Sequence, residues 1–142
     1  MSTTASSSGV MAGKRGLVMG VANERSIAWG IAAKLAEQGA ELAFTYQGEA
    51  LKKRVGPLAA SVGSSLVMPC DVTDEVSMDA TFANLQKKWG KMDFLLHAIA
   101  YSDKEELKGS YVETSRDNFA RTMDISVYSF TAVARRAAAM MN

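Results

Sequence analysis

The chain has 142 residues, of which 48% are hydrophobic, and a formal net charge of +1 at pH 7. This allows one domain with its own core, gives no electrostatic basis for binding nucleic acid or a membrane surface, and leaves no apolar run long enough to cross a bilayer. A single cysteine, Cys70, excludes an internal disulfide and fits a reducing cytoplasm, and one cysteine with one histidine cannot make a usual structural zinc site.

The chain opens with a small, polar segment, in which residues 2–8 read STTASSS. This segment lacks the apolar centre of a secretory signal and the arginines of a transit peptide. It therefore predicts a disordered leader over residues 1–13, followed by one domain over residues 14–142.

Residues 16–36 have the pattern of a strand, a turn led by Gly20, and a helix that opens at Ser26. N–H groups at a helix start lack acceptors and the helix dipole adds partial positive charge, so a phosphate can bind there. Ala22 keeps the turn narrow, Ser26 either caps the helix or donates to a phosphate oxygen, and Ile27 begins the apolar helix face. The turn lacks the second glycine of the G-x-G-x-x-G pattern, so an ordinary strand-to-helix turn remains an alternative.

Strands and helices alternate along the rest of the chain. Further strands are predicted at 41–46, 66–69 and 93–98. Helices are predicted from about 51 to 62, from a cap at Thr73 or Asp74 to Gly90, and from about Ser115 to the end. Gly56 and Pro57 are expected to kink or end the helix at 51–62. This order predicts an α/β fold with a doubly wound, Rossmann-like parallel sheet, incomplete at the C-terminus, that binds ligands at the carboxyl ends of its strands.

In such a sheet, four stretches converge on one edge: 20–27, 46–47, 70–72 and 97–101. Gln47 takes the place where an acidic residue would bind the adenosine ribose and repel a 2′-phosphate, while residues 52–54 (KKR) are interpreted as a solvated helix face. Asp71 is a candidate acceptor for the adenine amino group, beside the backbone of Val72, and its alternative role is that of a turn residue. His97 is interpreted as structural, and Cys70 as a buried small hydrophobe.

Five segments in register resemble the enoyl-acyl carrier protein reductases of bacterial fatty-acid synthesis, a divergent branch of the short-chain dehydrogenases: GVANERSIAWGIA, FTYQGE, CDVTDE, DFLLHAIAYSDKEELKGSYVETS and MDISVYSF. The resemblance covers nearly everything from Lys14 to Asn142. It implies NADH as cofactor, an enoyl substrate carried by acyl carrier protein, and a homo-oligomer that is a tetramer in full-length members.

The resemblance also implies which residues contact the cofactor. By position these are Gly20, Ala22, Ser26 and Ile27 at the pyrophosphate and ribose, Gln47 at the adenosine end, Asp71 and Val72 at the adenine, Ala98, Ile99 and Ala100 at the nicotinamide ribose, and Ile125 with Ser126 beneath the nicotinamide. Ordinary short-chain dehydrogenases have Asn-Ala-Gly at 98–100. The Ala-Ile-Ala found here favours the enoyl reductase branch over a ketoreductase.

The same resemblance implies hydride transfer to the β-carbon of the enoyl thioester, with a tyrosine donor and a lysine seven residues later, both after a fifth strand. That spacing occurs at Tyr46–Lys53 and Tyr101–Lys108, but neither pair is expected to share a helix face. The chain is therefore expected to be the cofactor-binding half of a longer enzyme, without catalytic residues and inactive alone. A ketoreductase and a stand-alone dinucleotide-binding module remain alternatives, and a methyltransferase is a weaker one.

Overall fold

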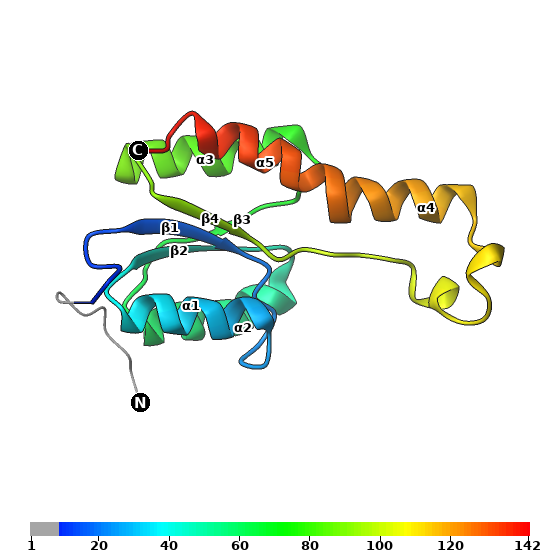
Figure 1. Ribbon diagram of the computed structural model, residues 1–142, viewed down its shortest axis with the longest axis horizontal. Coiled ribbons are helices and arrows are strands. Elements are labelled where there is room, and N and C mark those ends of the chain that lie inside the picture. The colour runs from blue at the N-terminus through cyan, green and yellow to red at the C-terminus, as the bar shows by residue number, and fades with distance from the viewer. Residues whose placement is uncertain (1–8) are drawn as a thin grey trace.

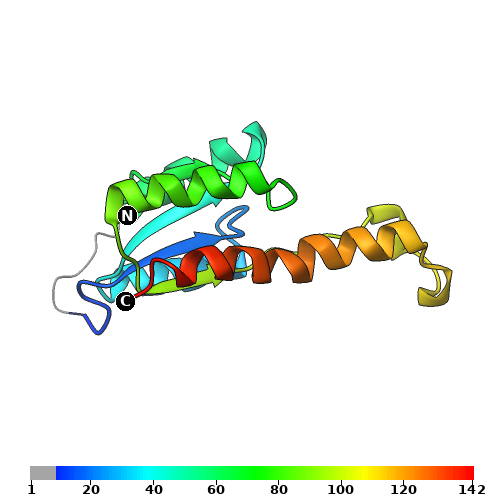
Figure 2. The same ribbon diagram turned by 90° about the horizontal axis from the view of Figure 1, so that it is seen from above.

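The computed structural model describes residues 9–142 as a parallel four-stranded sheet between two layers of helices (Figures 1 and 2). The strand order is β3-β2-β1-β4. The strands are β1 (Arg15–Met19), β2 (Glu41–Tyr46), β3 (Val67–Pro69) and β4 (Phe94–His97). The helices are α1 (Ile27–Glu37), α2 (Glu49–Ser61), α3 (Glu75–Trp89), η1 (Lys104–Leu107), η2 (Tyr111–Glu113), α4 (Arg116–Met123), η3 (Asp124–Tyr128) and α5 (Ser129–Ala138). The doubly wound α/β fold is confirmed.

The beginning of the described chain lies against the end of α1. Residues 1–8, most of the predicted leader, lie outside the described residues. Residues 9–13 form turns, in which the Met11 N–H donates to the Gln38 carbonyl at 2.8 Å, and Met11 packs against the core. The part of the predicted leader from Gly9 onward is thus held to the domain by a hydrogen bond and an apolar contact.

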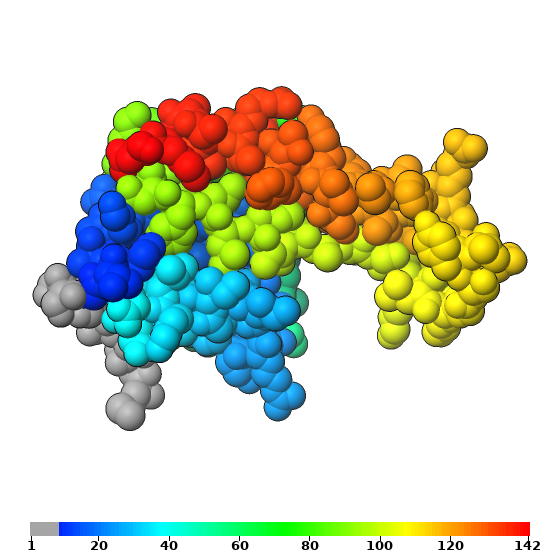
Figure 3. Space-filling view, in the orientation of Figure 1, coloured from blue at the N-terminus to red at the C-terminus, as the bar shows by residue number. Residues whose placement is uncertain are grey.

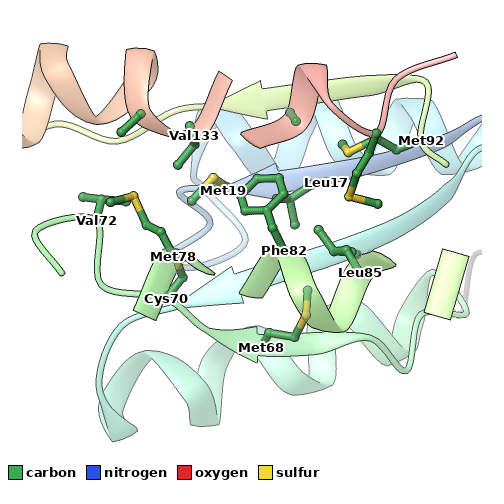
Figure 4. Packing of buried hydrophobic residues seen from close by; sticks show 14 residues of the cluster. Leu17, Met19, Met68, Cys70, Val72, Met78, Phe82, Leu85, Met92 and Val133 are labelled. Atoms are coloured by element: carbon green, nitrogen blue, oxygen red, sulfur yellow. The ribbon is translucent and has the colours of Figure 1, made fainter. Parts of the chain in front are cut away.

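The sheet has a separate core on each face. Successive residues of a strand point to opposite faces, so Val18 packs with α1 and α2 whereas Leu17 and Met19 pack with α3 and α5. In the second core, Phe82 and Leu85 of α3 lie against Leu17 and Met19 (Figure 4). Because all four strands are parallel, their carboxyl ends lie at one edge of the sheet.

Two expectations about the first helices need correction, since Ile27 does not begin a buried face and Pro57 does not end its helix. Ile27 is 81% exposed, and the buried face of α1 consists instead of Ala28, Ala32 and Ala36. Small side chains at this spacing let the helix approach the sheet closely, and Ile27 lies outside that stripe. Helix α2 also continues through Pro57 to Ser61. Pro57 lies on the exposed side of α2, where water can serve the carbonyl that loses its donor, while buried neighbours hold the helix to the sheet.

Other predicted helix ends are confirmed. The Asp74 carboxylate caps α3 by accepting from the Val76 N–H at 2.9 Å, and Gly90 ends that helix with a positive φ of 72°. The long last helix begins after Ser115, whose hydroxyl accepts from the Asn118 N–H at 3.1 Å. It runs as α4, η3 and α5 to residue 138, and η3 is a π-helical turn within it.

Strand β4 is half-buried along its whole length. Within residues 9–142 it pairs with β1 on one side only. Just before β4, Met92 forms a parallel bridge with Met141, and the Asn142 N–H donates to the Met92 carbonyl at 3.0 Å. The last described residues therefore begin to pair along the open side of the sheet.

Beyond β4 the chain leaves the body of the domain. The segment with η1 and η2 and the start of α4 projects past the sheet (Figures 1 and 3). Several large apolar side chains of this segment and the following helix are exposed, among them Leu107, Tyr111, Val112, Phe119, Met123, Val127 and Phe130. Over the described residues, no helix combines the length and the apolar character needed to cross a membrane.

Candidate functional site

A cleft of about 410 Å³ lies at the carboxyl ends of the strands. It opens where the strand order reverses, since β1 has β2 on one side and β4 on the other, and this is the usual ligand position in an open α/β sheet. The cleft is lined by Gly20, Val21, Ala22, Thr45, Tyr46, Gln47, Leu51, Cys70, Asp71, Val72, Thr73, Ala98, Ile99, Ala100, Tyr101, Arg121 and Ile125. Of the cofactor residues in the predicted set, Ser26, Ile27 and Ser126 do not line it.

Gly20 directly follows β1 and packs against Ala98, which directly follows β4. Its φ is 111°, and a Cβ atom at this position would overlap the carbonyl oxygen of Ala98. The Ala98 N–H in turn donates to the Met19 carbonyl at 2.9 Å, which fixes the two strand ends side by side. Glycine is therefore required by the packing of the protein itself as well as by the turn.

Ser26 organises the turn that follows Gly20. Its side chain does not cap α1, so that alternative is wrong, and its Oγ instead accepts from the N–H groups of Ala22 at 2.9 Å and Asn23 at 3.0 Å. These two bonds use the lone pairs of Oγ and leave its proton available for a ligand. Together with the N–H groups at the start of α1, the Ser26 hydroxyl gives this turn donors suited to an anion.

Gln47 follows β2 and Asp71 follows β3, and both line the cleft on the side of β1 that is away from β4. Asp71 forms a turn, which is the alternative role predicted for it. Its Oδ1 accepts from the Thr73 N–H at 2.9 Å and from the Thr73 hydroxyl at 2.7 Å. The side chain lines the cleft in the same conformation, so the turn fixes the carboxylate in place. Residues 52–54 are exposed and do not line the cleft, as expected of a solvated helix face.

The wall after β4 is held by the long last helix. The Tyr101 N–H donates to the Ser126 Oγ at 2.9 Å, and the Ser126 hydroxyl donates back to the Tyr101 carbonyl at 3.1 Å. The Arg121 guanidinium lies over the Tyr101 ring, 4.8 Å from its centre. Asn118, 8% exposed, accepts from the Asp103 N–H at 3.0 Å through its Oδ1.

Four residues that line the cleft were not predicted to do so from the sequence: Thr45, Leu51, Thr73 and Arg121. Arg121 precedes Ile125 by four residues, so the two share one face of the last helix. That spacing was the signal that would have found it. Leu51 and Thr45 flank Gln47, and only the three-dimensional packing distinguishes them from ordinary core positions.

His97 lies at the end of β4, where its Nε2 is 2.7 Å from the Oγ of Ser129. Its ring meets Phe130 edge to face at 5.5 Å. Burial lowers the pKa of His97 below its usual 6.5, so the imidazole is held neutral near neutral pH. These contacts agree with a structural histidine.

Other singled-out residues pack as predicted. Cys70 is 6% exposed, and burial raises the pKa of its thiol, which makes it a poor nucleophile. The two tyrosine–lysine pairs do not share a helix, because Tyr46 ends β2 and Tyr101 lies in the loop before η1. The residues from 9 to 142 contain no group of three or more histidine, cysteine or acidic side chains able to hold a metal ion.

Comparison with known proteins identifies relatives along nearly the whole chain. The family model described as "Enoyl-(Acyl carrier protein) reductase" matches residues 20–142. The enoyl-[acyl-carrier-protein] reductase [NADH] 1 of Rhizobium meliloti is 67% identical over 138 residues, covering 97% of this chain and 51% of that protein. The chain thus spans about half the length of the curated relatives it matches.

Solved structures agree with the sequence comparison. FabI from Candidatus Liberibacter asiaticus superposes with a TM-score of 0.92 at 53% identity, covering 94% of this chain and 52% of that one. The enoyl-(acyl-carrier-protein) reductase from Anaplasma phagocytophilum, solved in complex with NAD, gives a TM-score of 0.90 at 53% identity over the same shares. The family match, the identity to relatives and the shared fold together show that this chain belongs to the enoyl-acyl carrier protein reductase family.

Proposed function

We propose that the cleft binds NADH and that this chain is the cofactor-binding half of an enoyl-acyl carrier protein reductase. The observation that carries the proposal is the convergence of the Gly20–Ser26 turn, Asp71 and residues 98–100 on one cleft at the reversal of strand order. The Anaplasma relative in complex with NAD supports the same cofactor.

The cleft residues fit the successive parts of a dinucleotide. The turn from Gly20 to Ser26 would bind the pyrophosphate through N–H groups and the Ser26 hydroxyl. The adenine would lie beside Asp71 and Val72, with Gln47 at the adenosine ribose. Residues 98–100 and Ile125 would enclose the nicotinamide ribose and ring, and Ile27 would contribute its N–H from the first turn of α1.

We favour NADH over NADPH because the position beside the adenosine ribose is the neutral Gln47. A 2′-phosphate there would need a cation, and residues 52–54 do not line the cleft. Arg121 does line it, but beside Tyr101, at the opposite end from Gln47 in this arrangement.

In the reaction, hydride would pass from NADH to the β-carbon of a trans-2-enoyl thioester on acyl carrier protein, while negative charge develops on the thioester oxygen. That oxygen needs a positioned donor. We propose that the tyrosine and lysine of the family's mechanism belong to the part of the reductase that this chain does not cover. A homo-oligomer and a cytoplasmic location are further parts of this proposal.

The test uses a hybrid reductase, in which residues 1–142 are joined to the second half of the Rhizobium meliloti relative. We expect NADH-dependent reduction of a crotonyl thioester, followed as loss of NADH absorbance, and no reduction of an acetoacetyl thioester. The matched control is the second half alone, which lacks the cleft. Acetoacetyl reduction would favour the ketoreductase alternative, and NADH binding without turnover would favour a binding module.

A further inference from the structure

A chain of hydrogen bonds links the end of β4 to the π-helical turn of the last helix. Ser129 is fully buried, and its hydroxyl donates to the Ile125 carbonyl at 2.6 Å. The same Oγ lies 2.7 Å from His97 Nε2. A hydroxyl has one proton, so Ser129 accepts from His97, and the imidazole carries its hydrogen on Nε2. We call the arrangement His97–Ser129–Ile125 the relay.

The relay acts at the point where the helix departs from α geometry. The Ser129 N–H donates to the Asp124 carbonyl five residues back, as in a π-helix, rather than to Ile125 four residues back. The Ser129 hydroxyl takes over as donor to Ile125. Because a π-turn is less favourable than an α-turn, it needs such outside contacts to persist, and the neutral His97 supplies one from the sheet.

Each end of the relay adjoins a residue of the cleft. His97 immediately precedes Ala98, whose backbone packs against Gly20, and Ile125 itself lines the cleft. The Ser126–Tyr101 bonds make a second connection between the π-turn and the same wall. Residues 98–100 therefore lie between two residues that are hydrogen-bonded to the last helix, His97 and Tyr101.

We propose that His97, acting through Ser129, is a positioning residue that fixes Ile125 and the segment 98–100 against the nicotinamide end of the bound cofactor. This inference rests on the proposed function. The hydrogen bonds of the relay involve neither Ser26 nor Asp71, so we expect its effect at the nicotinamide end of the dinucleotide.

The experiment compares two ligands of the hybrid reductase, NADH and ADP, which has the adenosine and both phosphates but lacks the nicotinamide ribose and the nicotinamide. We expect Ser129→Ala to raise the Kd of NADH about fivefold, in line with the loss of one buried hydrogen bond, and to leave the Kd of ADP unchanged. His97→Phe keeps the ring beside Phe130 but removes the donor, and should give the same selective loss. The double variant should bind NADH no more weakly than either single variant, because the two substitutions break the same relay.

Ser61→Ala is the matched control, since Ser61 also donates its hydroxyl at 2.6 Å to a carbonyl of its own helix, Leu58, away from the cleft. It should change neither Kd. If Ser129→Ala does not fold, His97→Phe alone decides the question. Equal loss of affinity for both ligands, or no loss for either, would overturn the positioning role while leaving the proposed function intact. Absence of NADH binding by the unmutated hybrid would overturn both.

Discussion

The two halves of the cleft are built in different ways. In the half that follows β1 and β3, the fixing bonds are local: Ser26 holds Ala22 and Asn23, and Thr73 holds Asp71. In the half that follows β4, the bonds join residues 25 and 32 positions apart, between Tyr101 and Ser126 and between His97 and Ser129. The first half is therefore shaped by its own turns, whereas the second depends on the packing of the last helix.

The largest expected effect is on turnover, which needs more than the two halves of the cleft. Residues 1–142 alone should show turnover at least about 100-fold below that of the hybrid reductase, because we propose that the donor to the enolate belongs to the part of the reductase that this chain does not cover. The assay is NADH oxidation with a crotonyl thioester. Size-exclusion chromatography with light scattering should also show self-association of the shorter chain, through the exposed apolar side chains of its last helix. Turnover equal to that of the hybrid would return Tyr101 to consideration as the donor.

A second prediction concerns the contact on which both halves depend. Gly20→Val should lower the free energy of unfolding by about 3 kcal/mol or more, because its Cβ would overlap the Ala98 carbonyl and its φ of 111° disfavours a branched side chain. The measurement is urea unfolding of the hybrid. Gly30→Ala is the control: it lies in α1 with open space around it, and should be neutral or stabilising. Equal stability of Gly20→Val and the parent would show that the two strand ends are not in contact.

The third prediction separates the halves by ligand. Ser26→Ala should weaken the binding of NADH and of ADP alike, by about 1 kcal/mol, since both ligands carry the two phosphates. Ser126→Ala should weaken NADH only, and Ser126→Thr, which retains the hydroxyl, should restore the affinity. Isothermal titration calorimetry on the hybrid gives both affinities. A loss restricted to NADH in Ser26→Ala would place the pyrophosphate elsewhere.

The smallest effect is a pH dependence of stability from His97. Its folded pKa lies below 6.5 because of burial, so the unfolded chain binds more protons in the interval between the two values. The free energy of unfolding should therefore fall as the pH drops below about 6.5 and be flat above it. Urea unfolding across this range, compared with His97→Phe, isolates the contribution. Because His97 is the only histidine, its NMR titration gives the folded pKa directly, and a value above 6.5 would reverse the predicted sign.

The contrast between local and long-range contacts explains which features could be predicted from the sequence. The alternation of elements, the Asp74 cap, the Gly90 helix end and the edge where the site lies follow from local patterns, and the structure agrees with them. The errors at Ile27 and Pro57 arose because close packing of α1 and the hold of buried neighbours on α2 override local preference. The relay could not be predicted, because it depends on a π-turn and on contacts between residues far apart in the chain, whereas Arg121 could have been found from its spacing to Ile125.

The most direct test of the central claim is a crystal structure of the hybrid reductase with NADH. The account predicts adenine beside Asp71 and Val72, the pyrophosphate at the Gly20–Ser26 turn, and the nicotinamide between residues 98–100 and Ile125. Electron density for the dinucleotide in the reverse direction, or outside this cleft, would contradict it.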